Sequence, residues 1–138
     1  MNTNKNMEIV REFTRIFKNE HNVEGIDHLF HPDFTHNFRQ NLPPGLEGFK
    51  TIGRMMNGTF PDVYVTEEDL IASGDKVVER SSAKGTHLGD MLGVAPTGNV
   101  IYWTEIHIYQ IKDEKIIQHW VEWSDMELME QIKPTSSA

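Results

Sequence analysis

The segment HWVEWSD, residues 119–125, places two carboxylates beside two tryptophans and a histidine. A carboxylate held near a carbon next to a carbonyl can remove a proton from that carbon, and burial makes it a stronger base by raising its pKa. An indole N–H or an imidazole can then donate a hydrogen bond to the enolate oxygen. Glu122 and Asp125 are therefore candidate acid–base groups. The alternative is a polar strand end whose Asp125 caps a final helical turn.

The strands that carry these residues decide which way the side chains point. Residues 100–111 and 116–124 are rich in β-branched and aromatic side chains, which predicts two long strands. Side chains alternate along a strand, so Trp120 and Glu122 share one face. In the other strand one face carries Trp103, Glu105, His107 and Tyr109. We expect both faces to point into one cavity, with Glu122 as the first acid–base candidate and Asp125 as the reserve, turned inward by a bulge.

Hydrophobic periodicity divides the chain into a helical part and an extended part. Before Pro61, apolar residues recur at helical spacing in three segments: residues 9–17, 23–30 and 46–56. We expect Pro32 to end the second helix. After Pro61 the period becomes two, which predicts four strands at residues 63–70, 77–86, 100–111 and 116–124, and a last helical turn at 126–132. The sequence therefore predicts an α+β domain whose bent antiparallel sheet is covered by about three N-terminal helices and leaves a hollow for a small apolar ligand.

Composition limits the classes of function. The 138 residues carry a formal net charge of −8, which disfavours binding to nucleic-acid phosphates. The sequence has no cysteine, so thiolate chemistry is excluded and a cytoplasmic protein is expected. Sequence motifs for zinc, phosphate loops and dinucleotides are absent, and no apolar run could span a membrane. We expect one domain over residues 1–133, a disordered tail over 134–138, no metal and no cofactor.

Six segments are similar to one known family. They are PPGLEGFK (43–50), FPDV (60–63), GDKVVER (74–80), GTHLGDMLGVAPTGN (85–99), KIIQHW (115–120) and LMEQI (128–132). On these segments the sequence resembles the SnoaL-like polyketide cyclases, or ester cyclases, of the nuclear transport factor two-like superfamily. The resemblance implies a cone-shaped α+β barrel that dimerises through its sheet. It also implies an intramolecular aldol condensation of a polyketide ester without metal or cofactor.

The resemblance also implies the positions of site residues. The family often has a histidine or an aspartate at the position of His107, pointing into the cone, and a histidine near His36, just before the PPG segment. The alternative for His36 is a loop histidine. The family usually has a tryptophan at Trp120 and an acid–base aspartate four residues later, where this sequence has Ser124. Asp125 adjoins that position, which puts the cyclase chemistry in question.

Two functions are compatible with these residues. The first is enolate chemistry on a small hydrophobic carbonyl compound, as in a cyclase or an isomerase like ketosteroid isomerase. The second is a non-catalytic module that binds a hydrophobic small molecule. In that case the serine at position 124 reflects the loss of the family's acid–base residue. For the first function the candidate catalytic residues are Glu122, Asp125 and His107. The candidate substrate-binding residues are His36, Trp103, Tyr109 and Trp120. The expected partners are a hydrophobic carbonyl ligand and a second copy of the chain.

Overall fold

The computed structural model describes residues 2–38 and 40–132 of the chain. Helix α1 (Thr3–Phe13) runs directly into a π-helical segment, η1 (Thr14–Asn19), and a short 3-10 helix, η2 (Glu24–Leu29), comes next. The remaining elements are β1 (Phe30–His36), α2 (Gly45–Thr59), β2 (Tyr64–Ser73), β3 (Lys76–Thr86), β4 (Val100–Lys112), β5 (Lys115–Trp123) and α3 (Asp125–Ile132). Helices dominate before Pro61 and strands dominate after it, so the predicted α+β division is confirmed.

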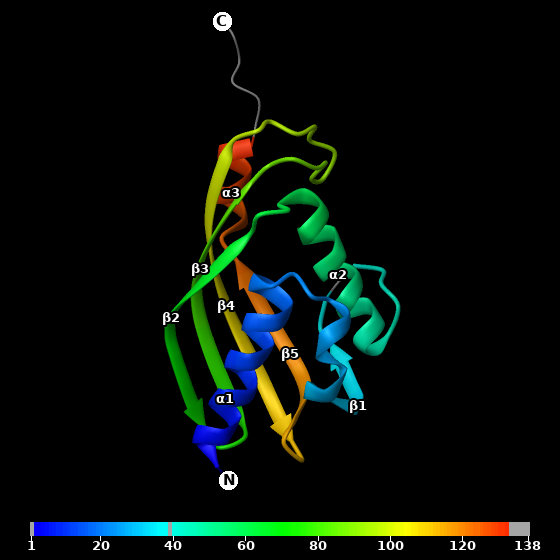
Figure 1. Ribbon diagram of the computed structural model, residues 1–138, viewed down its shortest axis with the longest axis vertical. Helices are drawn as coiled ribbons and strands as arrows, with labels where there is room; N and C mark the ends of the chain where they lie inside the picture. Colours follow the sequence, from blue (N-terminus) through cyan, green and yellow to red (C-terminus); the bar gives the residue numbers. More distant parts are fainter. Residues whose placement is uncertain (1, 39, 133–138) are drawn as a thin grey trace, which may run out of the picture.

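One sheet holds all five strands, in the order β1-β5-β4-β3-β2. The four long strands pair antiparallel with their neighbours, as expected. β1 pairs parallel with β5, so the sheet is mixed and the expectation of a wholly antiparallel sheet is wrong at this edge. The chain passes through α2 and three further strands between β1 and β5, so no hairpin turn dictates the direction of this pair. Figure 1 shows α1 and α2 beside the curved sheet.

The second helix ends before the residue that its apolar spacing predicts. η2 stops at Leu29 and Phe30 begins β1, so Pro32 lies inside a strand rather than at a helix end. A proline is tolerated in an edge strand because its missing N–H can lie on the unpaired side. The register of β1 with β5 is irregular between Phe30 and Thr35, a stretch that includes the proline. This edge strand leads the chain to Phe38, which reaches the candidate site.

Apolar side chains of both halves of the chain meet between the helices and the inner face of the sheet. Phe13 stacks on Phe17 with 5.1 Å between ring centroids, and Phe49 of α2 lies 5.2 Å from Phe17. Such ring pairs add a favourable geometric interaction to the burial of apolar area. A second apolar cluster, which includes Phe60 and Trp103, lies where α3 packs against β4. The helices are thus fixed to the sheet at two places.

The C-terminal tail that the sequence predicts to be disordered, residues 134–138, lies outside the described residues. Within the part of the chain that the structure describes, every helix is too short or too polar to cross a membrane.

Gly53 allows α2 to approach the first helical segment closely. A Cβ atom at this position would overlap the ring of Phe17. Gly53→Ala should therefore lower the free energy of unfolding by about 1–3 kcal/mol, because the crowded ring must leave its packed position. Gly58 of the same helix has open space in place of a side chain, so Gly58→Ala should be neutral or stabilise by up to about 1 kcal/mol. Urea unfolding of both variants measures the difference, and equal stabilities would contradict the close approach.

Candidate functional site

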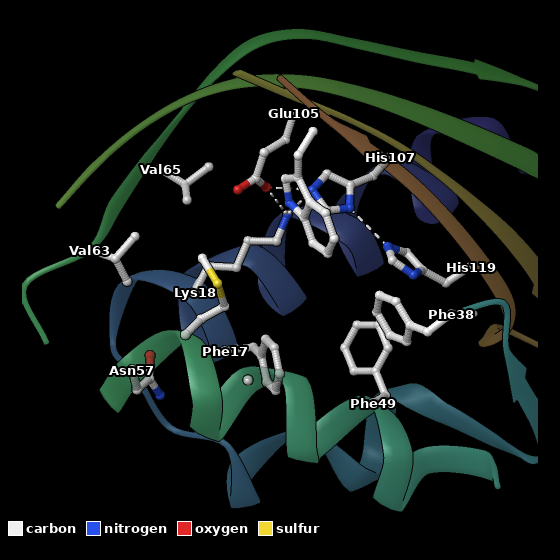
Figure 2. Close-up of a pocket in the computed structure, with 13 residues that line it drawn as sticks. Phe17, Lys18, Phe38, Phe49, Asn57, Val63, Val65, Glu105, His107 and His119 are labelled. Atoms are coloured by element: carbon white, nitrogen blue, oxygen red, sulfur yellow. Dashed lines mark hydrogen bonds and ion pairs between the residues drawn. The ribbon is translucent and has the colours of Figure 1, made fainter. Parts of the chain in front are cut away.

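An apolar cavity of about 70 Å³ lies between α2 and the inner face of the sheet. We call it the inner cavity. Figure 2 shows Glu105, His107 and His119 on the sheet side with Lys18 reaching toward them, and Phe49 and Asn57 toward α2. Its polar lining includes Lys18, Glu105, His107 and His119, and its aromatic lining includes Phe17, Phe38, Phe49 and Trp123. A ligand in this cavity would meet hydrophobic walls and one polar end.

Two inward-facing side chains of β4 form the polar end. Nε2 of His107 lies 2.6 Å from Oε1 of Glu105, and Nε1–H of Trp103 donates to Oε2 of Glu105 over 2.7 Å. Glu105 is only 5% exposed, and both of its carboxylate oxygens accept a hydrogen bond from a neighbouring ring. Hydrogen bonds to an ionised carboxylate stabilise its charged form. Glu105 thus fixes the orientation of both of its ring partners.

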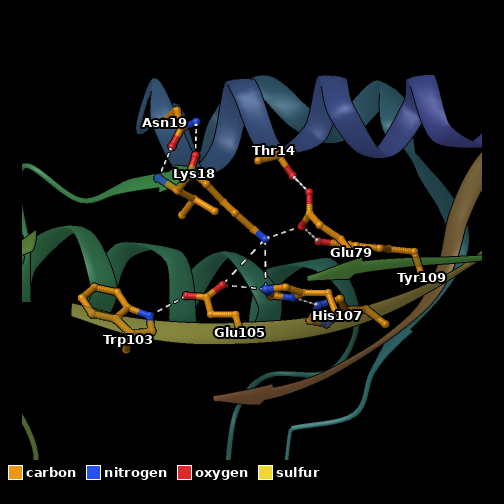
Figure 3. A network of polar contacts seen from close by, with 10 residues as sticks. Thr14, Lys18, Asn19, Glu79, Trp103, Glu105, His107 and Tyr109 are labelled. Atoms are coloured by element: carbon orange, nitrogen blue, oxygen red, sulfur yellow. Dashed lines mark hydrogen bonds and ion pairs between the residues drawn. The ribbon is translucent and has the colours of Figure 1, made fainter. Parts of the chain in front are cut away.

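The π-helical segment η1 brings a cation to this carboxylate. Nζ of Lys18 lies 3.0 Å from Oε1 of Glu79 and 3.9 Å from Oε1 of Glu105. Thr14 donates its hydroxyl to Oε2 of Glu79 over 2.7 Å. Figure 3 shows Thr14 and Lys18 reaching from the helix toward Glu79 on the sheet. π-helical turns are rare and often occur at functional sites, and here the turn carries the side chains that meet the buried carboxylates.

A second histidine joins the cluster from β5. Nε2 of His119 lies 2.8 Å from Nδ1 of His107. The residue is 2% exposed, and its ring packs edge-on against Phe49 with 4.9 Å between centroids. Glu105, His107 and His119 therefore form a continuous hydrogen-bonded chain across the two central strands.

The surroundings set the ionisation of the cluster. Burial opposes ionisation of Glu105, but the hydrogen bond from His107 and the charges of His107 and Lys18 lower its pKa to about 2. Burial also opposes ionisation of Glu79, and the charge of Lys18 nevertheless lowers its pKa. Burial, followed by the charge of Lys18, lowers the pKa of His107. Burial, followed by the charges of His107 and Lys18, lowers the pKa of His119 well below its usual value. At neutral pH the two carboxylates are ionised and the two histidines are neutral.

Two larger hollows adjoin the inner cavity. The first, about 350 Å³, is lined by several apolar side chains and shares Met56 and Trp123 with the inner cavity. We call it the methionine hollow, after Met55, Met56, Met91 and Met129. The second, about 430 Å³, shares His119 and Trp123 with the inner cavity and also contains Glu122 and Asp125. We call it the acidic groove.

Lys18, Glu105, His107 and His119 bond to one another along one wall of the inner cavity. Among residues 2–38 and 40–132, no group of three or more histidine, aspartate or glutamate side chains is placed to hold a metal ion.

The prediction that one face of β4 points into the interior is confirmed. Trp103, His107 and Tyr109 are all buried on that face. His107 lines the inner cavity, whereas Trp103 lines the methionine hollow. Tyr109 lies behind the cluster, where its hydroxyl donates to Glu79 over 3.3 Å. The roles of these residues in catalysis or substrate binding stay predictions.

The prediction that Trp120 and Glu122 of β5 face the cavity is wrong. Trp120 and Glu122 lie on the outer face of the sheet, opposite two isoleucines of β4. The cause is one extra residue at Ile117, where the register between β4 and β5 shifts. Because side chains alternate with a period of two, one extra residue inverts the facing of every later position in the strand. The side chains that turn inward after the bulge are therefore His119, Val121 and Trp123.

The other predicted residues lie outside the inner cavity. Asp125 begins α3 and lines the acidic groove. The hydroxyl of Ser124 accepts the backbone N–H of Thr104 over 2.9 Å and so links the residue after β5 to β4. Nε2 of His36 lies 2.9 Å from the carbonyl oxygen of Pro43 and ties down the loop before α2. His36 is the last residue of β1, so it lies in a strand and not in a loop, and its role in substrate binding stays a prediction.

Sequence reasoning missed three polar residues of the cluster. Glu79 could have been found, because it alternates with apolar and small residues along a predicted strand. Lys18 gave no signal, because it comes after the apolar stripe of the first helix and only the π-helical turn directs it inward. His119 was assigned to the outer face, since the bulge at Ile117 leaves no mark in the hydrophobic pattern.

The low pKa of Glu105 makes stability depend on pH. Its pKa is about 2 in the folded protein, against about 4.3 for an unfolded glutamate. The stabilisation is complete above about pH 4.3 and is lost as the pH falls toward 2, by about 3 kcal/mol in total. Glu105→Gln should lack this component, so the gap in unfolding free energy between wild type and variant should narrow by about 3 kcal/mol over that interval. Urea unfolding across the interval checks this, and parallel curves would contradict it.

Comparison with known proteins associates this fold with one family. The model of the SnoaL-like polyketide cyclases matches residues 8–132. TsrD from Streptomyces laurentii is 28% identical with a TM-score of 0.86, and the match covers 96% of this chain and 97% of TsrD. IdmH from Streptomyces antibioticus is 26% identical with a TM-score of 0.78, covering 91% of this chain and 96% of IdmH.

A SnoaL-like polyketide cyclase from Agrobacterium tumefaciens shares the fold at a TM-score of 0.79 and 18% identity, covering 96% of this chain and all of that one (100%). No curated protein sequence matches the chain. The family model spans almost the whole chain, and the solved relatives have the same cone of helices and curved sheet. The chain therefore belongs to the SnoaL-like polyketide cyclase family.

Proposed function

We propose that this protein performs cofactor-independent enolate chemistry on a small hydrophobic carbonyl compound held in the inner cavity, as a polyketide cyclase does. One observation carries the proposal: a buried cluster of Lys18, Glu79, Glu105, His107 and His119 lies at the wall of an otherwise apolar cavity. Burying charged groups costs several kcal/mol per ion, even when they are paired. Such a cluster beside a cavity therefore favours a chemical role over a purely structural one.

The cavities suit a ligand with a compact polar head and a larger apolar body. The inner cavity, about 70 Å³, has room for a carbonyl group and its neighbouring carbons. The methionine hollow, about 350 Å³, can take the hydrophobic remainder. Methionine side chains adapt to irregular apolar shapes. Met56 and Trp123 line both spaces, so one molecule can extend from the hollow into the inner cavity.

Lys18 supplies the positive charge that an enolate requires. Its side chain lines the inner cavity and is only 11% exposed. A fixed cation stabilises a developing oxyanion far more in a site that excludes water than in solution. The flanking carboxylates of Glu79 and Glu105 hold the ammonium in place. Proton transfer then falls to the histidines of the cluster, which are neutral at neutral pH because burial lowers their pKa values.

Ser124 favours one alternative function. By resemblance, this position carries the acid–base aspartate in characterised members of the family, and here the hydroxyl is occupied by the N–H of Thr104. A protein that lost its acid–base group would bind the carbonyl compound without converting it. The two functions differ in one observable, because a ketone that is only bound keeps its α-protons.

Replacing Lys18 should slow enolate formation. The probe is ethyl β-benzoylpropionate, an aryl ketoester, in deuterium oxide, and the measurement is deuterium incorporation next to the ketone. Lys18→Met should slow protein-dependent exchange by about two orders of magnitude or more, because the oxyanion loses its cation in a buried site.

Lys50→Met is the matched control. Lys50 is also a buried lysine, with a side chain 8% exposed and paired with Glu24 and Asp27, but it does not line the inner cavity. Exchange by this variant should equal that of the wild type. If wild type binds the probe and promotes no exchange, the binding function replaces the enzymatic one.

We also propose that the outer face of the sheet forms a homodimer. Exposed large hydrophobic side chains gather on this face: Tyr64, Val100, Tyr102 and Ile106. Trp120, half-buried, lies on the same face of β5. An exposed apolar patch of this kind is typical of a protein–protein interface.

Ile106→Lys should convert the dimer to a monomer, because burying a lysine in an apolar interface is unfavourable. Sedimentation velocity at micromolar concentration measures the change. Met126→Lys, which alters an exposed methionine on α3, should leave the dimer intact. A wild-type monomer at that concentration would rule the interface out.

A further inference from the structure

The geometry points to Nδ1 of His119 as the atom that accepts the substrate proton, with His107 and Glu105 behind it as a relay. This inference rests on the proposed enolate chemistry and assigns its base. Neither the hydrophobic pattern nor the family's aspartate position leads to this residue. Two hydrogen bonds and one unoccupied nitrogen carry the assignment.

The first step fixes the tautomer of His107. Its Nε2 lies 2.6 Å from an oxygen of Glu105, a carboxylate that stays ionised at neutral pH. Two acceptors cannot approach so closely without a hydrogen between them, so the proton of the neutral ring is on Nε2. Nζ of Lys18 lies 3.0 Å from the same nitrogen. The carboxylates of Glu79 and Glu105 bracket the ammonium and offset the contact between these two donors.

The second step fixes the direction of the bond between the histidines. With the proton on Nε2, Nδ1 of His107 is an acceptor. Nε2 of His119, 2.8 Å away, must therefore donate to it. A neutral imidazole carries one N–H, so Nδ1 of His119 is an unprotonated acceptor. The chain runs from the Glu105 carboxylate through His107 to a free lone pair on His119.

The third step places that lone pair. Nδ1 of His119 makes no hydrogen bond to any residue that the structure describes. The ring lines both the inner cavity and the acidic groove. Phe49 at 4.9 Å and Tyr109 at 5.0 Å between ring centroids hold it in position. A buried imidazole with a fixed tautomer and one unoccupied nitrogen at a cavity wall has the form of a general base.

The other groups of the cluster are less suited to this role. Both oxygens of Glu105 already accept hydrogen bonds, from Trp103 and His107. Both nitrogens of His107 are occupied, Nε2 beside Glu105 and Lys18 and Nδ1 by His119. Ser124 is engaged with the backbone of β4. His119 alone combines contact with the cavity and an unoccupied acceptor among the described residues of the cluster.

The proton transfer balances within the relay. The C–H bond next to the ketone breaks, its proton binds Nδ1 of His119, and its electron pair forms the enolate, whose oxygen faces Lys18. The Nε2 proton of His119 moves to Nδ1 of His107, so the positive charge comes to lie next to the Glu105 carboxylate. The enolate carbon then forms a bond with a second carbonyl carbon of the same molecule. The resulting alkoxide takes a proton back from Nδ1 of His119, and the relay returns to its first state.

The groups around His119 keep it available as a base. It faces His107 and Tyr109 of β4, Lys18 of η1 and His36 of β1. Burial and then the charges of His107, Lys18 and His36 lower its pKa. A base with a lowered pKa stays unprotonated to a lower pH, so exchange activity should persist below about pH 6.5, the usual histidine pKa, and fall only when Nδ1 becomes protonated.

Nitrogen NMR of the histidine rings tests the relay without any substrate. In the ligand-free wild-type protein at neutral pH, His107 and His119 should both carry their proton on Nε2 and show an unprotonated Nδ1. A proton on Nδ1 of either ring would overturn the assignment, because the lone pair would no longer face the cavity. This result does not depend on whether enolate chemistry occurs.

Deuterium exchange into ethyl β-benzoylpropionate tests the role of the base. His119→Gln should slow protein-dependent exchange by about two orders of magnitude and abolish the acid limb of its pH profile. His87→Gln is the matched control, since His87 is also fully buried but bonds to Thr97 and lines neither the inner cavity nor the two hollows beside it. That variant should exchange at the wild-type rate with an unchanged pH profile.

Wild-type exchange and pH profile in His119→Gln would overturn the assignment of the base. If the wild-type protein incorporates no deuterium into the probe, the proposed function is wrong and the site has no base. The tautomers measured by NMR still decide whether the hydrogen-bonded relay exists. The two failures are therefore distinguishable.

Discussion

The ion pair between Lys18 and Glu79 is the interaction on which the site depends. Nζ of Lys18 in η1 lies 3.0 Å from Oε1 of Glu79, which is fully buried on the inner face of β3. Two carboxylates lie in this interior, and without the lysine they would repel each other in a medium that screens charge poorly. Removing one partner of a buried pair is strongly destabilising, by about 3–5 kcal/mol, because the other charge stays behind. The cluster therefore requires the helix to dock, and docking places Phe17 and Lys18 in the wall of the inner cavity.

This constraint explains the irregular backbone beside the site. An α-helix that continued regularly beyond Phe13 would carry its side chains forward at a fixed angle per residue. The π-helical turn changes that angle over Thr14–Asn19, and both Thr14 and Lys18 reach Glu79. Asn19 also exchanges hydrogen bonds with the backbone of Val65, which ties the end of the turn to β2. A less favourable local helix is thus stabilised by contacts that lie far away in the sequence.

Features that depend on local periodicity could be predicted from the sequence, whereas most features that depend on pairing between distant elements could not. The inward face of β4, with His107 on it, could be predicted because that strand is regular and its side chains alternate. The direction of β1 could not, because parallel pairing with β5 depends on how the whole chain folds back. The contact of Lys18 with Glu79 joins residues 61 positions apart, and no local pattern records it. The bulge in β5 is a further case, since one extra residue changes no composition but reverses every later side chain.

That bulge connects the sequence of β5 with its proposed chemistry. In a regular strand Trp120 and Glu122 would face the cone and His119 would lie outside. With the extra residue, His119 enters the cluster next to His107, and the hydroxyl of Ser124 is left to bond the backbone of β4. The family's aspartate position, Ser124, thus lies five residues after the base proposed here and just beyond the end of β5. An imidazole backed by a second imidazole and a carboxylate can pass its charge inward, away from the substrate. Residue identity at one position is therefore a poor guide to activity when a bulge decides which side chains of the strand face the cavity.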